Sequence, residues 1–168
     1  MKWGKLMEYA EYKWVRQNRE ILLEQCSNLN ENEISKEFDF GFQNIKKSLV
    51  HIAGCYHAWL GSFVLEKIER PLFTNEEITT LDINDIKQYF LEADQYVEEI
   101  LDRERNELDN RIHKTAIWKQ DNQFIEKTIR QLLFHSITHE YHHKGQIVTM
   151  LRMLGYTPNN TDVLRLSI

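Results

Sequence analysis

Four of the chain's seven histidines lie close together in the segment FHSITHEYHHKGQI, at positions 135, 139, 142 and 143. Neutral imidazole is the commonest protein ligand for zinc and related metals. Because a helix turns about 100° per residue, His139 and His143 would share one face, with His135 and His142 on its flank. This pair predicts a metal site, although a single histidine on an apolar face is more often a core residue.

A third ligand has to come from elsewhere, and the segment HIAGCYHAWL contains two histidines six residues apart. On a helix His51 and His57 would face different ways, so only one of them can join the pair. Small side chains such as Ser48 flank His51 and leave room for a metal, so the helical pattern favours His51. Cys55, one turn further on, is either a fourth ligand or a small core residue, which is the commoner role of a free cysteine.

The elements that would carry these residues are helices. The chain has only two prolines and six glycines, and apolar residues recur three and four positions apart over long stretches. Helices are predicted at about 5–27, at 43–66, from Asp82 or Asn84 onward, and at 129–154. Four such helices predict an all-α, four-helix bundle.

The inward faces of two of these helices follow from their apolar spacing. The expected inward side chains are Leu6, Tyr9, Ala10, Trp14, Ile21 and Leu22 in the first helix and Ile86, Tyr89, Phe90, Ala93, Val97 and Ile100 in the third. Between about Ile112 and Phe124 the helical period fails, and a short β-hairpin turning near 120–122 is predicted before the last helix. We expect residues 1–168 to form one domain.

Composition and charge argue against several classes of partner. The net charge is −5 and there is no dense cluster of lysine and arginine, so no nucleic-acid binding is expected. No apolar run approaches the roughly 18 residues of a membrane span. The N-terminus shows no secretory signal, so we expect a cytoplasmic protein in which Cys26 and Cys55 stay reduced.

Several segments of the chain resemble a known family, and two of them carry recognisable motifs. Residues 132–158 are similar to the last-helix signature of the DinB-like (DinB/YfiT) superfamily of four-helix-bundle metalloproteins. In that signature a histidine, three residues and a second histidine are followed by a basic residue, glycine and glutamine, here His139, His143, Lys144, Gly145 and Gln146. The segment SLVHIAGCYHAWLGSF resembles the family's other motif, a histidine followed eight residues later by a tryptophan, here His51 and Trp59. The resemblance extends over nearly the whole chain.

The resemblance implies a metal site made by His51, His139 and His143. Three protein ligands leave positions open on the metal, as in reactive rather than structural sites. Zinc is named first because it is common, while nickel, iron, cobalt and manganese suit the same ligands. Relatives include transferases and isomerases that use low-molecular-weight thiols such as bacillithiol, so a thiol S-transferase is the leading function. A hydrolase using metal-bound hydroxide and a non-catalytic, stress-associated binding protein stay open as alternatives.

Other residues near the predicted site are candidates for supporting roles. No catalytic residue is assigned beyond the metal centre itself. Glu140, as a base, and Gln146, without an assigned role, are candidates. Tyr56, Trp59 and Gln146 are candidates for the wall of a substrate pocket, although an aromatic side chain at helical spacing more often belongs to the core.

The first helix carries a surplus of aromatic side chains. Trp3, Tyr9, Tyr12 and Trp14 would lie on more than one of its faces, which offers apolar surface to a partner. Relatives are often homodimers, so the resemblance implies a homodimer here. In the competing account, the chain's own loops cover these aromatic side chains.

Overall fold

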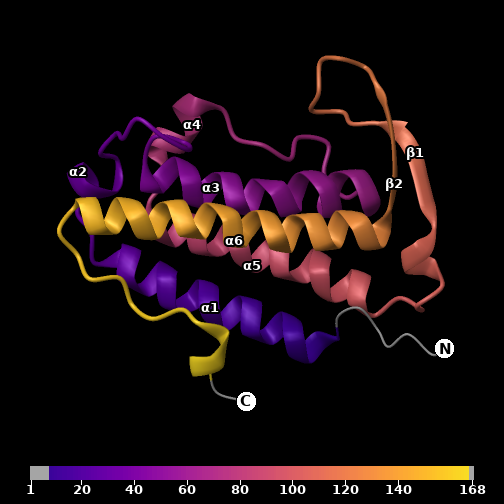
Figure 1. The fold of residues 1–168 in the computed structure, drawn as a ribbon. Coiled ribbons are helices and arrows are strands. Elements are labelled where there is room, and N and C mark those ends of the chain that lie inside the picture. Colours follow the sequence, from indigo (N-terminus) through magenta and orange to yellow (C-terminus); the bar gives the residue numbers. More distant parts are fainter. Residues whose placement is uncertain (1–7, 167–168) are drawn as a thin grey trace.

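Four long helices run lengthwise beside one another in the computed structural model, which describes residues 8–166 (Figure 1). They are α1 (Tyr9–Ser27), α3 (Ile45–Tyr56), α5 (Ile83–Leu101) and α6 (Ile129–Met153), and α3 continues as a π-helical segment, η1 (His57–Val64). The connections contain α2 (Glu31–Ile34), α4 (Asn75–Thr80) and η2 (Glu107–Asp109), and η3 (Val163–Arg165) follows α6. The predicted mainly helical bundle is confirmed.

Local signals account for most helix boundaries. The side chains of Asn44, Asp82 and Thr128 accept hydrogen bonds from backbone N–H groups in the first turns of α3, α5 and α6. Gly155 follows α6 with φ +91°, a conformation that glycine adopts without strain. The last helix therefore lies where it was predicted. The predicted start of the first helix near residue 5 lies outside the described residues.

The second predicted helix needs a correction. It was expected to be one regular helix over 43–66, but from His57 onward the chain winds as a π-helix with a wider turn. Gly61 lies in this segment, and a Cβ there would come within 2.7 Å of Ile68 and 2.8 Å of Tyr96. Close packing against the wider helix therefore depends on a residue without a side chain. Apolar spacing alone does not distinguish the two helix types.

The predicted hairpin is confirmed. Strand β1 (Arg111–Thr115) pairs antiparallel with β2 (Phe124–Thr128), with Arg111 opposite Thr128, and the chain turns through residues 116–123. Ile112 and Ile125 pack partly buried against the core, while neighbouring positions are exposed, as the two-residue period of a strand requires. Because β2 leads directly into α6, the hairpin sits at the end of the bundle where α6 begins (Figure 1).

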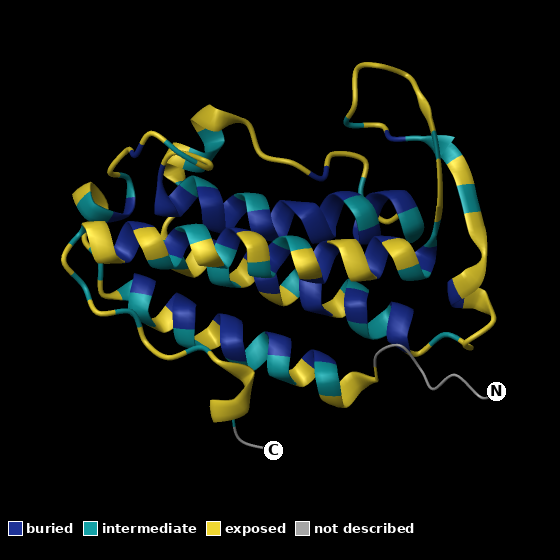
Figure 2. Ribbon diagram, in the orientation of Figure 1, coloured by how far each residue is buried: buried dark blue, intermediate teal, exposed yellow. Residues whose placement is uncertain are grey.

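The core lies between the four long helices, and α3 is buried on most of its surface (Figure 2). All six inward residues predicted for the third helix are buried in α5. Of the inward residues predicted for the first helix, only Leu22 is buried among those that the structure describes. Tyr9 is 53% exposed, Ala10 is exposed, Trp14 and Ile21 are only partly buried, and Leu6 lies outside the described residues. The buried residues of α1 are Tyr12, Val15, Asn18, Arg19, Leu22, Leu23 and Cys26.

The buried face of α1 differs from the predicted one because it contains an ionic network around Arg19. Its guanidinium donates hydrogen bonds of 2.9 and 3.0 Å to the two carboxylate oxygens of Glu140 and one of 2.6 Å to Asp94. Tyr12 donates to Asp94 and Tyr56 donates to Glu140, each at 2.6 Å. An arginine whose charge is paired in this way can occupy a core position, which a search for apolar residues misses. The network joins α1, α3, α5 and α6.

Within residues 8–166, no helix combines the length and apolar character needed to cross a membrane.

Candidate metal centre

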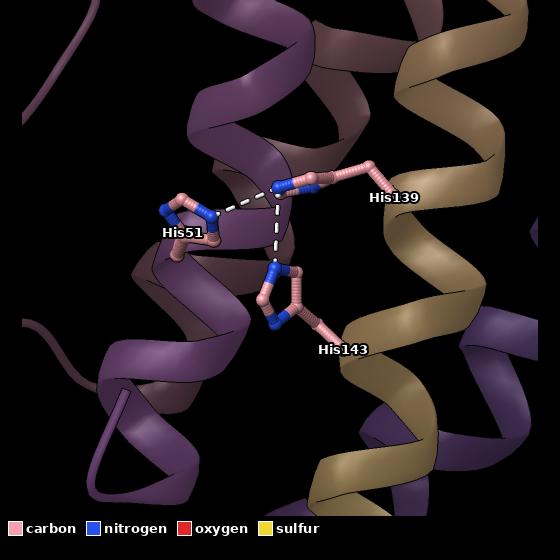
Figure 3. Close-up of side chains that lie close together, drawn as sticks. All are labelled: His51, His139 and His143. Atoms are coloured by element: carbon pink, nitrogen blue, oxygen red, sulfur yellow. Dashed lines mark hydrogen bonds between the residues drawn. The ribbon is translucent and has the colours of Figure 1, made fainter. Parts of the chain in front are cut away.

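Three histidine side chains meet between α3 and α6 (Figure 3). His51 lies in the middle of α3, and His139 and His143 lie on successive turns of α6. Nε2 of His139 is 3.0 Å from Nε2 of His51 and 3.1 Å from Nε2 of His143. The structure thus brings together the three predicted ligands, which form a group able to hold a metal ion, with all ligand atoms within 4.8 Å of one another.

The two Nε2–Nε2 distances at His139 fit a pair of nitrogens bound to one divalent ion. Metal–nitrogen bonds of about 2.1 Å would place two nitrogens roughly 3.0 Å apart at right angles and roughly 3.4 Å apart at the tetrahedral angle. Hydrogen bonds alone satisfy the cluster less well. Nε2 of His139 faces two other Nε2 atoms, and each neutral imidazole carries a single N–H. An ion that accepts the lone pairs of all three nitrogens removes this conflict.

The surroundings favour the neutral form that a ligating imidazole requires. Burial, followed by the nearby His143, lowers the pKa of His51 to about 4. Burial and the neighbouring histidines lower the pKa of His139 to about 3. Burial also lowers the pKa of His143, against a smaller opposing effect of its hydrogen bond to Gln146. At pH 7 the three rings are therefore neutral, with lone pairs available to a metal.

Gln146 fixes the ring of His143. The amide oxygen Oε1 lies 2.8 Å from Nδ1 of His143, and because this oxygen only accepts, Nδ1 must carry the proton. The lone pair of His143 is then on Nε2, the atom that faces His139. Partners of this kind orient metal-binding histidines. Nδ1 of His139, in contrast, is buried without a hydrogen-bond partner among residues 8–166, so the ring's polar contacts are those of Nε2.

The loop before α3 covers one side of the centre, which sequence reasoning missed. Phe42 stacks on His51 with ring centroids 3.6 Å apart and meets His143 edge-on at 5.2 Å. Gly41 has φ +58°, and a Cβ there would lie 2.6 Å from Oε1 of Gln146. The positive φ favours glycine here, and any side chain would require the Gln146 amide to move. The only signal in the sequence is the GF pair in a polar loop, which does not reveal its contact with α6.

The chain also matches the sequence model of a known protein family. The sequence model of the DinB family matches residues 5–167. The chain belongs to the DinB family. A search of curated proteins found no match to it. In this DinB-family chain, the three histidines that converge are those of the two family motifs, His51 in one motif and His139 and His143 in the other.

The other two histidines of the last helix lie outside the three-nitrogen group of this DinB-family chain. His142 is exposed, with its ring centroid 4.8 Å from that of His143. His135 is also exposed, 5.3 Å from His139, and Trp59 meets it edge-on at 6.1 Å. Trp59 is partly buried, and the histidine that it contacts is His135.

The remaining predicted site residues lie behind the centre. Glu140 is 5% exposed and both its oxygens are engaged by Arg19 and Tyr56, an environment poorly suited to a general base. Tyr56 is completely buried in the same network and does not line an open pocket. Cys55 does not belong to the metal-binding group, and burial raises the pKa of its thiol to about 12. Its placement matches the interpretation of a small core residue.

Proposed function

We propose that this DinB-family protein binds a divalent metal ion through Nε2 of His51, His139 and His143 and acts as an S-transferase with a low-molecular-weight thiol. The observation that carries the proposal is the convergence of three neutral imidazole nitrogens at 3.0 and 3.1 Å. Zinc is the first candidate, and nickel, iron, cobalt or manganese would fit the same donors.

A metal held by three protein nitrogens supplies a Lewis acid that favours the thiolate form of a thiol at neutral pH. The protein's own residues prepare the centre for it. Gln146 holds the proton of His143 on Nδ1. Phe42, in the loop before α3, stacks on His51 and covers that side of the centre. The access that we propose for the electrophile is on the His135 side, where Trp59 offers an aromatic edge.

A hydrolase is the second candidate, and the surroundings of the histidines favour it less. Hydrolysis by a metal-bound hydroxide usually relies on a carboxylate near the metal as general base. Among residues 8–166 no carboxylate joins the three histidines, and Glu140 is held by Arg19 and Tyr56. Thiol transfer needs no such base once the thiolate is formed.

The test is a conjugation assay with purified protein loaded with zinc. Bacillithiol, mycothiol and cysteine would each be mixed with a bimane electrophile, and formation of the thioether would be followed by fluorescence. The proposal predicts acceleration with at least one thiol, loss of that acceleration in His143→Ala, and its retention in His113→Ala, where an exposed hairpin histidine is removed. Metal-loaded protein that accelerates no conjugation would leave the non-catalytic binding protein as the better account.

A further inference from the structure

A cavity lies beside η1, and the three histidines are not among the residues that line it. It has a volume of about 250 Å³, is open on one side, and is bordered by η1, the connection from residue 65 to 74, α4 and α5. Four aromatic rings line it. The ring of His57 stacks on Tyr89 at 3.7 Å and meets Tyr96 edge-on at 5.2 Å, and Phe73 meets Tyr89 edge-on at 4.9 Å.

Specific contacts hold the walls of this cavity in place. The hydroxyl of Tyr89 donates a 2.6 Å hydrogen bond to the backbone oxygen of Pro71, which ties the connection to α5. A Cβ on Gly54 would lie 3.0 Å from Leu72, and one on Gly61 would lie 2.8 Å from Tyr96. Glycines at these two positions therefore let the opposite walls approach the helix. The cavity is a packed feature of the fold rather than a gap between loose loops.

His57 lines this cavity and is held by a hydrogen bond to the backbone. Its side chain is 3% exposed, and its Nε2 lies 2.8 Å from the backbone oxygen of Tyr89. A carbonyl only accepts, so Nε2 must carry the proton of the neutral ring, and Nδ1 keeps a lone pair. Burial lowers the pKa of His57, which favours this neutral form.

The charges around the cavity sum to one negative charge. Arg70 pairs with Glu77 at 2.6 Å, so these two residues balance. Glu92 forms no ion pair with any residue in the described part of the chain. Burial raises the pKa of Tyr96, and the carboxylate of Glu92 raises it further, as expected for a negative charge close to that ring.

We propose that this cavity binds a small organic cation, an amine or a quaternary ammonium group, between the rings of Tyr89, Tyr96 and Phe73 and the carboxylate of Glu92. The faces of aromatic rings attract cations, and several rings around one cavity form the usual recognition site for ammonium groups. A neighbouring carboxylate without a basic partner strengthens this preference and disfavours anions. The site is separate from the proposed metal centre and does not depend on it.

The test is calorimetric titration of the full chain with choline and with its uncharged isostere, in which a quaternary carbon replaces the nitrogen. We expect saturable binding of choline at up to about 10 mM and none of the isostere. Glu92→Gln keeps the shape of the side chain and should weaken binding about tenfold. Glu99→Gln is the matched control, because Glu99 lies two turns further along α5 and pairs with Lys67 outside the cavity.

Three results would overturn the proposal. They are the absence of choline binding over that range, equal binding of the uncharged isostere, and equal weakening in Glu92→Gln and Glu99→Gln. The second would show an apolar cavity without preference for charge, and the third would show a general effect of surface charge. A circular dichroism spectrum of each variant would establish that it is folded. Tyr96→Leu, which removes a ring and leaves the carboxylate, should also lose most of the binding.

Discussion

Single residues around the three histidines hold the imidazole rings in their positions. Gly41 combines a positive φ with close contact to Gln146, and Gln146 in turn fixes the proton of His143. A methyl group at position 41 would therefore strain the backbone and push Gln146 out of place. Gly145, in contrast, lies in α6 with open space around it.

These two glycines make a matched pair of substitutions with opposite expected effects. Gly41→Ala should lower the free energy of unfolding by about 1–2 kcal/mol, because alanine is disfavoured at positive φ. Gly145→Ala should raise it by about 0.5–1 kcal/mol, because alanine favours helix. Urea denaturation of the metal-free proteins measures both values. A stabilising effect of Gly41→Ala would show that the loop before α3 does not lie against Gln146 as described.

Protonation of the histidines gives a second prediction at this scale. The pKa values of His51 and His139 fall from 6.5 in a free side chain to about 4 and about 3 in the folded chain. As the pH falls below 6.5, the unfolded chain therefore takes up protons that the folded chain does not, and stability decreases. Between pH 6.5 and 4, the free energy of unfolding should fall less in metal-free His139→Gln than in the metal-free wild type. Urea denaturation at each pH measures it. His113→Gln is the control, and an unchanged slope in His139→Gln would contradict the burial of that ring.

At the scale of the helices, the network around Arg19 sets how α1 packs on α5 and α6. Arg19→Met would leave Glu140 and Asp94 buried without their partner, so we expect a loss of about 3–5 kcal/mol in the free energy of unfolding. Arg16→Met removes a partly exposed arginine that also contacts Asp94, at 3.3 Å, and should cost less than about 1 kcal/mol. Chemical denaturation measures the difference, and equal losses would mean that the buried network has no special role.

At the scale of the whole molecule, the features set by local sequence were predictable, and most of those set by tertiary contacts were not. Caps such as Asp82 and Thr128, together with Gly155, are encoded within a few residues, so the start of α5 and both ends of α6 were predictable. The buried face of α1 was not, because its central residue is an arginine whose partners come from two distant helices. The histidine trio was predictable because helical spacing and two family motifs agree. Phe42 was not, since its place depends on how a loop folds back on α3.

The homodimer stays a proposal at this scale. Among the aromatic residues expected to offer a surface, Tyr12 is completely buried, Trp14 is partly buried, Tyr9 is 53% exposed, and Trp3 lies outside the described residues. Sedimentation equilibrium would give the mass in solution. A dimer that Tyr9→Lys dissociates would support an interface on α1, and a monomer at all concentrations would reject it.

The central claim is that His51, His139 and His143 bind a divalent metal. Elemental mass spectrometry of untagged protein, with His143→Ala and His113→Ala prepared in the same way, tests it most directly. We predict near-stoichiometric metal in the wild type and in His113→Ala and little in His143→Ala, because a third ligand is needed for tight binding. Wild-type protein that carries no metal and takes up none from a zinc buffer would contradict the claim and make the three histidines packing residues.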